Sequence, residues 1–186
     1  MKRLEILPFG DPVLRMRAAE VTVFRKNLHQ TIDQMAYTLK KSDDGAALAA
    51  PQVGVLKRIV VVNALNEYLE LINPVIIERE GEQDGPEGCL SFPSFFGRVV
   101  RSDRIKIRYQ DRHGKPCELE RSGFMARCFQ HEIDHLDGIL FIDRMVDSDL
   151  KNDDTGQTIA LRAVQTLAPL PLSSEQPINS GFHSTN

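Results

Sequence analysis

Residues 131–135 read H-E-x-x-H, and this short run constrains the fold more than any other feature of the chain. On an α-helix, residues four apart lie on one face about one turn apart, so His131 and His135 can both reach one metal ion. Glu132 lies beside them, where it can accept a proton from water rather than bind the metal. The run therefore predicts a helix that carries a hydrolytic metal site, with an amide as the usual substrate.

The residues around this run are largely apolar, which indicates a helix inside the protein. They include Phe124, Met125, Cys128, Phe129, Ile133 and Leu136. Ser122 suits the N-cap of this helix, and Gly138 suits its C-terminal end. Two histidines and a glutamate are costly to bury unless something pairs with them, and a metal ion does so. A chance match on a solvent-exposed helix is the alternative, and the apolar neighbours argue against it.

The third metal ligand decides the kind of hydrolase. A metzincin needs a histidine where this chain has Phe141, so that completion fails. A thermolysin-like site needs a downstream glutamate, and only Glu175 follows, in a segment expected to be disordered. The remaining histidines, His29, His113 and His183, fit surface positions better.

The three cysteines are the other candidates for the third ligand. Cys128 lies one turn before His131 and competes for this role, although a small buried apolar residue is the common use of cysteine. Cys117 has an alternating strand position and is expected in the core. Cys89 follows a loop that could bring its sulfur to a site built elsewhere. A Cys-His-His set would leave a fourth tetrahedral position for water, as in catalytic sites.

Length and charge indicate one globular domain with an added tail. The chain has 186 residues and a formal net charge of −3 at pH 7, which gives no case for nucleic-acid or membrane partners. No window approaches the ~18 apolar residues of a membrane span. Its three cysteines cannot all pair, and no signal peptide is recognisable. We therefore expect a cytoplasmic protein with reduced thiols.

Hydrophobic periodicity predicts an α+β fold in which antiparallel β-strands pack around the central helix that carries the metal motif. A helix is predicted over 24–41, strands over 59–62, 69–72, 75–77, 104–109 and 117–120, and a polar loop over 78–88. Residues 1–146 are predicted to form the catalytic domain. Residues 147–186 are predicted to be a polar extension, with a short helix at 158–167 and a disordered tail from residue 169.

Three segments together resemble the peptide deformylase family. They are G-A-A-L-A-A-P-Q at 45–52, E-G-C-L-S at 87–91 and Q-H-E-I-D-H at 130–135, and the similarity runs from the N-terminus to about Arg144. The resemblance implies that Cys89, His131 and His135 bind the metal. It also implies hydrolytic removal of the formyl group from the N-terminal formylmethionine of nascent polypeptides. One Fe²⁺ per chain is implied, with Zn²⁺, Ni²⁺ or Co²⁺ as alternative ions.

The resemblance also assigns roles around the metal. Glu132 would carry a proton from water to the departing amine, while the Gln52 side-chain amide and the Leu90 backbone N–H stabilise the oxyanion. Substrate-binding positions are implied at Gly45, Ala47, Glu87 and Gly88. The family usually has glycine where this chain has Ala47, so we expect a shifted substrate fit.

Other features bear on the surroundings of the site and on competing functions. Residues 94–97 read S-F-F-G, an apolar stretch that implies a changed rim of the methionine pocket. Glu87 and Arg101 could form a buried pair that stabilises the cysteine loop, and Asp134, off the ligand face, could fix a nearby arginine. Proximity to the ribosome is expected, but the extension lacks a long basic helix, so we expect no docking through it. The alternatives are a metallopeptidase using the same helix and a non-catalytic deformylase-like protein that binds nascent chains.

Overall fold

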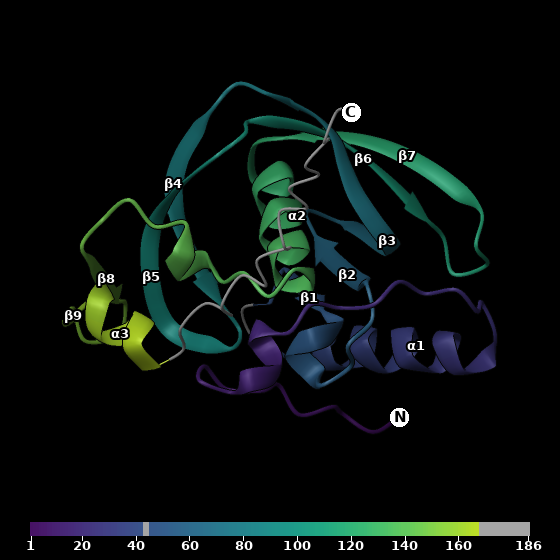
Figure 1. Ribbon diagram of the computed structural model, residues 1–186, viewed down its shortest axis with the longest axis horizontal. Coiled ribbons are helices and arrows are strands. Elements are labelled where there is room, and N and C mark those ends of the chain that lie inside the picture. Colours follow the sequence, from purple (N-terminus) through teal and green to yellow (C-terminus); the bar gives the residue numbers. More distant parts are fainter. Residues whose placement is uncertain (43–44, 168–186) are drawn as a thin grey trace, which may run out of the picture.

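The computed structural model describes residues 1–42 and 45–167 and confirms the predicted α+β class. The helix α2 (Gly123–Leu136) stands in the middle of the molecule, with an antiparallel sheet on either side of it (Figure 1). It carries the H-E-x-x-H run, as predicted, and Asp137 follows it as the C-cap before Gly138 adopts a left-handed φ of 73°. The tail predicted from residue 169 lies outside the described residues.

The larger sheet has five strands in the order β1-β2-β3-β6-β7. Their bounds are Ala47–Ala49, Ile59–Ala64, Glu67–Glu80, Arg104–Gln110 and Pro116–Ser122. The strands predicted at 69–72 and 75–77 are one strand, β3, with a register shift between Ile72 and Val75. Asn73 lies inside this shift with a φ of 53°, so the Asn-Pro pair produces a bulge rather than a strand end.

The second sheet has four strands in the order β4-β5-β8-β9. Their bounds are Gln83–Cys89, Phe92–Arg101, Asp149–Asn152 and Thr158–Ala160. The predicted polar loop at 78–88 is therefore wrong, since β3 continues to Glu80 and β4 begins at Gln83. Pro86 suggested a loop, but among the described strands β4 pairs with β5 alone, and an edge strand tolerates a proline that donates no hydrogen bond.

The described residues contain two further α-helices and three short 3-10 helices. The helix α1 (Lys26–Lys40) agrees with the predicted span of 24–41, and three short 3-10 helices are Pro12–Arg15, Ala50–Val53 and Phe141–Asp143. The helix predicted at 158–167 is shorter than expected, because β9 takes its first residues and α3 covers Leu161–Leu167. No helix in the described ranges is long and apolar enough to cross a membrane.

The core holds α2 against the larger sheet. Phe129, Ile133 and Leu136 pack on strands β1, β2 and β6, while α1 covers the other side of β1 and β2. Cys117, expected in the core, is only partly buried on β7. Phe124, which the apolar pattern predicted on a buried helix, is 52% exposed. The face of α2 that remains is therefore free to carry polar groups toward β4.

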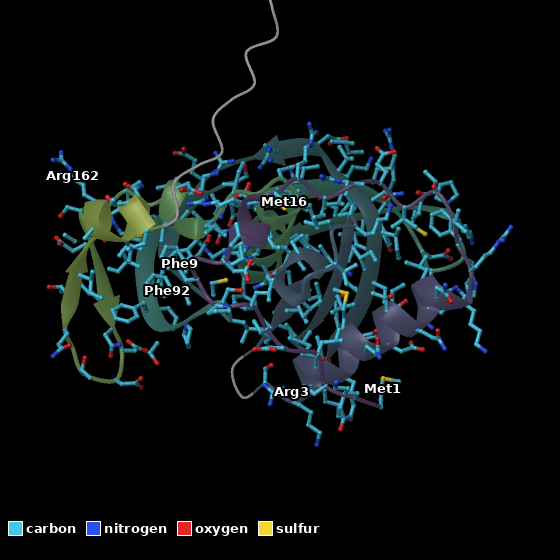
Figure 2. All side chains as sticks on the ribbon, turned by 60° about the horizontal axis from the view of Figure 1, so that its bottom comes forward. Met1, Arg3, Phe9, Met16, Phe92 and Arg162 are labelled. Carbon is cyan, nitrogen blue, oxygen red and sulfur yellow. The ribbon has the colours of Figure 1, made fainter. Side chains whose placement is uncertain are left out.

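A third cluster joins the N-terminal segment to β8 and α3. Phe9 of the N-terminal segment stacks on Phe92, with ring centroids 4.7 Å apart (Figure 2). Leu150 of β8 and Val164 of α3 are buried in the same cluster. Residues 149–164 thus pack on the rest of the structure, while the domain boundary at residue 146 stays a prediction.

Candidate metal centre and substrate pocket

Cys89, His131 and His135 meet where the end of β4 approaches α2. One potential ligand atom from each lies within 4.8 Å of the other two, and His135 Nε2 is 3.3 Å from Cys89 Sγ. A tetrahedral ion with bonds of about 2.0–2.3 Å holds its ligand atoms roughly 3.5 Å apart. The three residues therefore suit a metal ion. His135 is almost fully buried, and its Nδ1 has no hydrogen-bond partner within residues 1–42 and 45–167.

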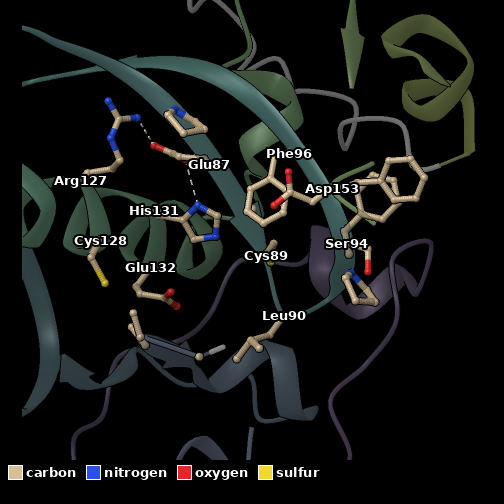
Figure 3. Close-up of a pocket in the computed structure, with 18 of the residues that line it drawn as sticks. Glu87, Cys89, Leu90, Ser94, Phe96, Arg127, Cys128, His131, Glu132 and Asp153 are labelled. Atoms are coloured by element: carbon tan, nitrogen blue, oxygen red, sulfur yellow. Dashed lines mark hydrogen bonds and ion pairs between the residues drawn. The ribbon is translucent and has the colours of Figure 1, made fainter. Parts of the chain in front are cut away.

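Glu132 lies on the pocket side of the same helix (Figure 3). It is buried, and its Oε2 has no hydrogen-bond partner among the residues that the structure describes. Burial raises the pKa of this carboxyl to about 7. A group with such a pKa can accept and release a proton near neutral pH, which is what a general acid–base residue requires.

The Gln52 side chain is held in one orientation beside the cysteine. The backbone N–H of Ala49 donates to Gln52 Oε1 at 2.8 Å, so the amide nitrogen faces away from Ala49. Gln52 Nε2 lies 3.4 Å from both Cys89 Sγ and Ser91 Oγ. Leu90 lies between these two residues in the turn from β4 to β5. Leu90 is thus part of the cysteine loop, and the Gln52 amide nitrogen faces this loop. Sequence reasoning did not identify Ser91.

The Glu87 carboxylate connects the cysteine strand to α2. Arg101 donates to it twice, at 2.8 and 3.0 Å, and Arg127 donates to it at 2.9 Å. Glu87 Oε2 also lies 3.0 Å from His131 Nδ1. Burial alone would raise the pKa of Glu87, but His131 and Arg101 outweigh it and hold the pKa well below its usual value. The buried Glu87–Arg101 pair proposed from the sequence is confirmed.

The same network continues toward solvent. Arg101 Nη1 lies 2.5 Å from Asp134 Oδ2, and Arg144 donates to Asp134 at 3.1 Å. Asp134 thus fixes an arginine, as predicted, and it lies outside the ligand cluster. The pairs anchor the cysteine strand to the helix that carries the histidines.

A pocket of about 550 Å³ opens over Gln52, Cys89, His131 and Glu132. Its lining includes all four residues expected to bind substrate: Gly45, Ala47, Glu87 and Gly88. Gly45 is closely packed, since a Cβ there would lie 2.8 Å from Leu39 Cδ1. Ala47 lies in the extended strand β1, so it needs no glycine-only conformation. Glu87 lines the wall, but its carboxylate is already occupied by His131 and the two arginines.

Several lining residues were not identified from the sequence. Arg127 is one of them, and a lone arginine within an apolar helix is a signal that a buried anion lies nearby. Asp153 and Asp154 also line the pocket, which no local pattern indicated. Cys128, the competing ligand, lies in the lining but outside the ligand cluster, and burial raises the pKa of its thiol. Cys128 therefore stays protonated.

Comparisons with known proteins agree with this geometry. The family model described as Polypeptide deformylase matches residues 3–151. The peptide deformylase of Heliobacterium modesticaldum is 52% identical over 141 residues, which covers 76% of this chain and 93% of that protein. Peptide deformylase 1 of Bacillus subtilis is 50% identical over 135 residues, which covers 72% of this chain and 84% of that protein.

Solved structures show the same similarity. The crystal structure of peptide deformylase from Thermotoga maritima has a TM-score of 0.76 and 47% identity, and it covers 79% of this chain and all of that one (100%). A peptide deformylase from Synechococcus elongatus in complex with actinonin has a TM-score of 0.77 and 36% identity, and it covers 94% of this chain and 91% of that one. The chain therefore belongs to the polypeptide deformylase family.

Proposed function

We propose that this protein is a peptide deformylase, a metal-dependent hydrolase that removes the formyl group from the N-terminal formylmethionine of nascent polypeptides. One observation carries the proposal: the Cys89, His131 and His135 ligand atoms converge beside an unpaired, buried Glu132 oxygen at the wall of a pocket. A purely structural site would have no use for that unpaired oxygen. The family membership supports the same conclusion.

Cys89, His131 and His135 would hold one divalent ion, for which we propose Fe²⁺. The site combines one thiolate with two imidazoles, a set that Zn²⁺, Ni²⁺ or Co²⁺ could also use. When bound, the ion supplies Lewis acidity, lowering the pKa of water and polarising the formyl oxygen. Glu87 would hold His131 in place through Nδ1, which leaves Nε2 for the ion.

Glu132 moves the proton. Its unpaired Oε2 would accept a proton from the attacking water and deliver it to the amine nitrogen as the formyl C–N bond breaks. The products are formate and a peptide with a free methionine amine. Because burial keeps this carboxyl from ordinary solvation, it can perform both transfers near neutral pH.

Gln52 and Leu90 would stabilise the charge that develops on the formyl oxygen. The Ala49 N–H fixes the Gln52 amide so that its N–H groups face the cysteine loop. Such fixed donors act without reorganisation during the reaction, and removal of one donor typically costs ~10²–10³ in rate. Gly45 and Ala47 would line the substrate side of the same pocket.

The direct test is hydrolysis of a formylmethionyl peptide by anaerobically prepared protein, with the metal content measured on the same sample. We expect formate release and no cleavage of a peptide with a free N-terminus. Cleavage of internal peptide bonds in unformylated peptides would instead indicate a metallopeptidase. Activity that survives prolonged exposure to air in protein containing only zinc would contradict the iron assignment.

A substitution of the proton carrier separates catalysis from binding. Glu132→Gln keeps the size of the side chain and cannot accept the proton, so we expect retained metal and loss of nearly all turnover. Unchanged function in this variant would favour the non-catalytic protein that binds nascent chains. We further propose that the enzyme acts in the cytoplasm close to the ribosome, without docking through its C-terminal segment.

A further inference from the structure

The N-terminal segment passes close to the reaction centre but outside the substrate pocket. None of residues 7–18, all of which the structure describes, lines that pocket. The Leu7 N–H donates to the Gln52 carbonyl at 2.8 Å. The Phe9 N–H donates to the Ser91 carbonyl at 2.6 Å. Residues 7–18, which we call the N-terminal strap, therefore hold the two segments from which the proposed oxyanion donors come.

The direct contact between these two segments is longer than either strap bond. Gln52 Nε2 lies 3.4 Å from Ser91 Oγ, whereas the strap bonds measure 2.8 and 2.6 Å. Hydrogen bonds weaken as the distance between donor and acceptor grows. The strap thus contributes more to the separation of the two segments than their own side-chain contact does.

Pro8 fixes the spacing of the two strap donors. It lies between Leu7 and Phe9, its ring locks its own φ, and it restricts Leu7 to extended conformations. Two residues of extended chain span about 6.6 Å. Pro8 is exposed, and its carbonyl accepts from the Asp11 N–H at 3.1 Å, where the chain turns into the short helix Pro12–Arg15. The two N–H groups are therefore held at a nearly constant separation.

The strap is fixed at both ends. Near its start the Phe9 ring stacks on Phe92, with ring centroids 4.7 Å apart (Figure 2). Cys89 packs against the same apolar cluster. At the other end the Ala18 N–H donates to the carbonyl of Leu136, the last residue of α2, at 2.8 Å. In Figure 1 the strap, in purple, passes the end of this helix. Anchors on both sides keep the strap against the donor segments.

We propose that Leu7, Pro8 and Phe9 are positioning residues for the hydrolysis. Through the two carbonyls they set the separation of the Gln52 amide and the Leu90 backbone N–H, and so the fit of these donors around the oxyanion. This inference rests on the proposed function and assigns a role in it to residues outside the pocket. Because the donors act on charge that develops in the transition state, a loosened strap should lower kcat and leave KM nearly unchanged.

Replacing Pro8 tests the spacing. Pro8→Gly keeps both strap N–H groups and, at an exposed position, loses little packing, but it frees the chain between the two donors. We expect kcat for a formylmethionyl peptide to fall about 5- to 20-fold, less than the ~10²–10³ that loss of a whole donor costs, with KM changed less than about 2-fold. Pro116→Gly, at an exposed proline that begins β7, is the matched control and should leave kcat unchanged. An unchanged kcat for Pro8→Gly, a change confined to KM, or an equal fall in the control would overturn the proposal.

A backbone ester at residue 7 tests whether the strap acts through Gln52. Leu7→leucic acid, the α-hydroxy analogue, keeps the side chain and removes the N–H that donates to the Gln52 carbonyl. We expect kcat to fall about 5- to 20-fold here as well, but less than about 2-fold in a Gln52→Ala background, where the amide that this bond positions is absent. Equal falls in the two backgrounds would show a general structural effect and contradict the positioning role.

Val21→α-hydroxyisovaleric acid is the matched control for the ester. The Val21 N–H donates to Asn73 Oδ1 at 2.8 Å, and neither residue lines the pocket. This ester removes a bond of the same length away from the donor segments, so kcat should not change. A fall equal to that of the Leu7 ester would count against the strap.

Amide resonances give a readout without turnover. In zinc-loaded, ¹⁵N-labelled protein, the signals of the Gln52 side chain and the Leu90 backbone N–H should shift in Pro8→Gly and stay in place in Pro116→Gly. If the wild type hydrolyses no formylmethionyl peptide but these signals shift, the strap positions the two groups and the proposed function is contradicted. If the wild type hydrolyses the peptides and Pro8→Gly changes neither the signals nor kcat, the strap fails while deformylation stands. A fall in kcat with unmoved signals would also overturn the positioning role.

Discussion

Glu87 Oε2 lies 3.0 Å from Nδ1 of His131, while the same carboxylate holds Arg101 and Arg127. One buried anion therefore joins the strand that ends in Cys89 to the helix that carries both histidines. A histidine whose second nitrogen is fixed in this way presents the other nitrogen in a defined direction. The position of the proposed metal ligands thus depends on a residue that would not itself bind metal.

Replacing Glu87 tests this dependence. Glu87→Gln keeps the side-chain shape but removes the anion that Arg127 pairs with and leaves Arg101 with Asp134 alone, so we expect a loss of about 3–5 kcal/mol in the free energy of unfolding. Loss of such a supporting contact typically weakens metal binding about 10- to 100-fold. Chemical denaturation and competition with a chelator measure the two effects.

Glu67→Gln is the control for this change. Glu67 pairs with Arg121 at 2.7 Å, but both side chains are partly exposed. The loss should stay below about 1 kcal/mol, with unchanged metal binding. Equal effects in the two variants would show that the buried network does not orient the site.

Gly88 tests how closely the pocket wall is packed. A Cβ on Gly88 would lie 2.5 Å from Cε1 of the Phe96 ring, so Gly88→Ala must displace that ring within the pocket. Overpacking of this kind costs about 1–3 kcal/mol, and the ring's displacement should lower kcat/KM for formylmethionyl peptides. Adding Phe96→Leu should restore part of both losses. If the losses in the double variant equal the sum of the losses in the two single variants, the two residues are not coupled.

The sequence predicted the reaction centre better than its surroundings. The spacing of His131 and His135 is a local property of one helix, so the helix and its face could be predicted directly. Glu87 and Arg101 have long-range partners, yet both are charged residues near a strong motif, which was enough to suggest their pairing. Arg127 was missed although its place in an apolar helix was a usable signal.

The wall formed by β4, β5 and β8 could not be predicted in the same way. The segment before Cys89 contains Gly85, Pro86 and Gly88 and has the composition of a loop. It forms a strand because β5 provides hydrogen-bond partners along its length. Asp153 reaches the pocket only because Asn152 pairs with Phe95, and nothing in the local pattern indicates that pairing.

Ala47 tests the departure from the glycine usual in the family. The residue lies in β1 opposite Val62, is buried, and does not have a positive φ. Ala47→Gly should therefore destabilise the protein by about 0.5–1 kcal/mol, because glycine loses more backbone freedom on folding. Since Ala47 lines the pocket, the variant should also accept bulkier groups in place of methionine. Thermal unfolding and a panel of formyl-aminoacyl peptides measure both effects, and greater stability of the variant would contradict the first.

The pH dependence of stability tests the burial of Glu132. A glutamate in the unfolded chain has a pKa of about 4.3, whereas burial raises the pKa of Glu132 in the folded protein to about 7. Between these values the folded state binds more protons than the unfolded state, so this group lowers stability as pH rises. In protein stripped of metal by a chelator, Glu132→Gln should match the wild type near pH 4. The variant should become more stable than the wild type as pH rises toward 7, by up to about 3–4 kcal/mol, since one pKa unit corresponds to ~1.4 kcal/mol.

Glu82→Gln, a change at an exposed carboxylate, should show no such trend. A stability difference between Glu132→Gln and the wild type that does not vary with pH would mean that this carboxyl is solvated in the folded protein.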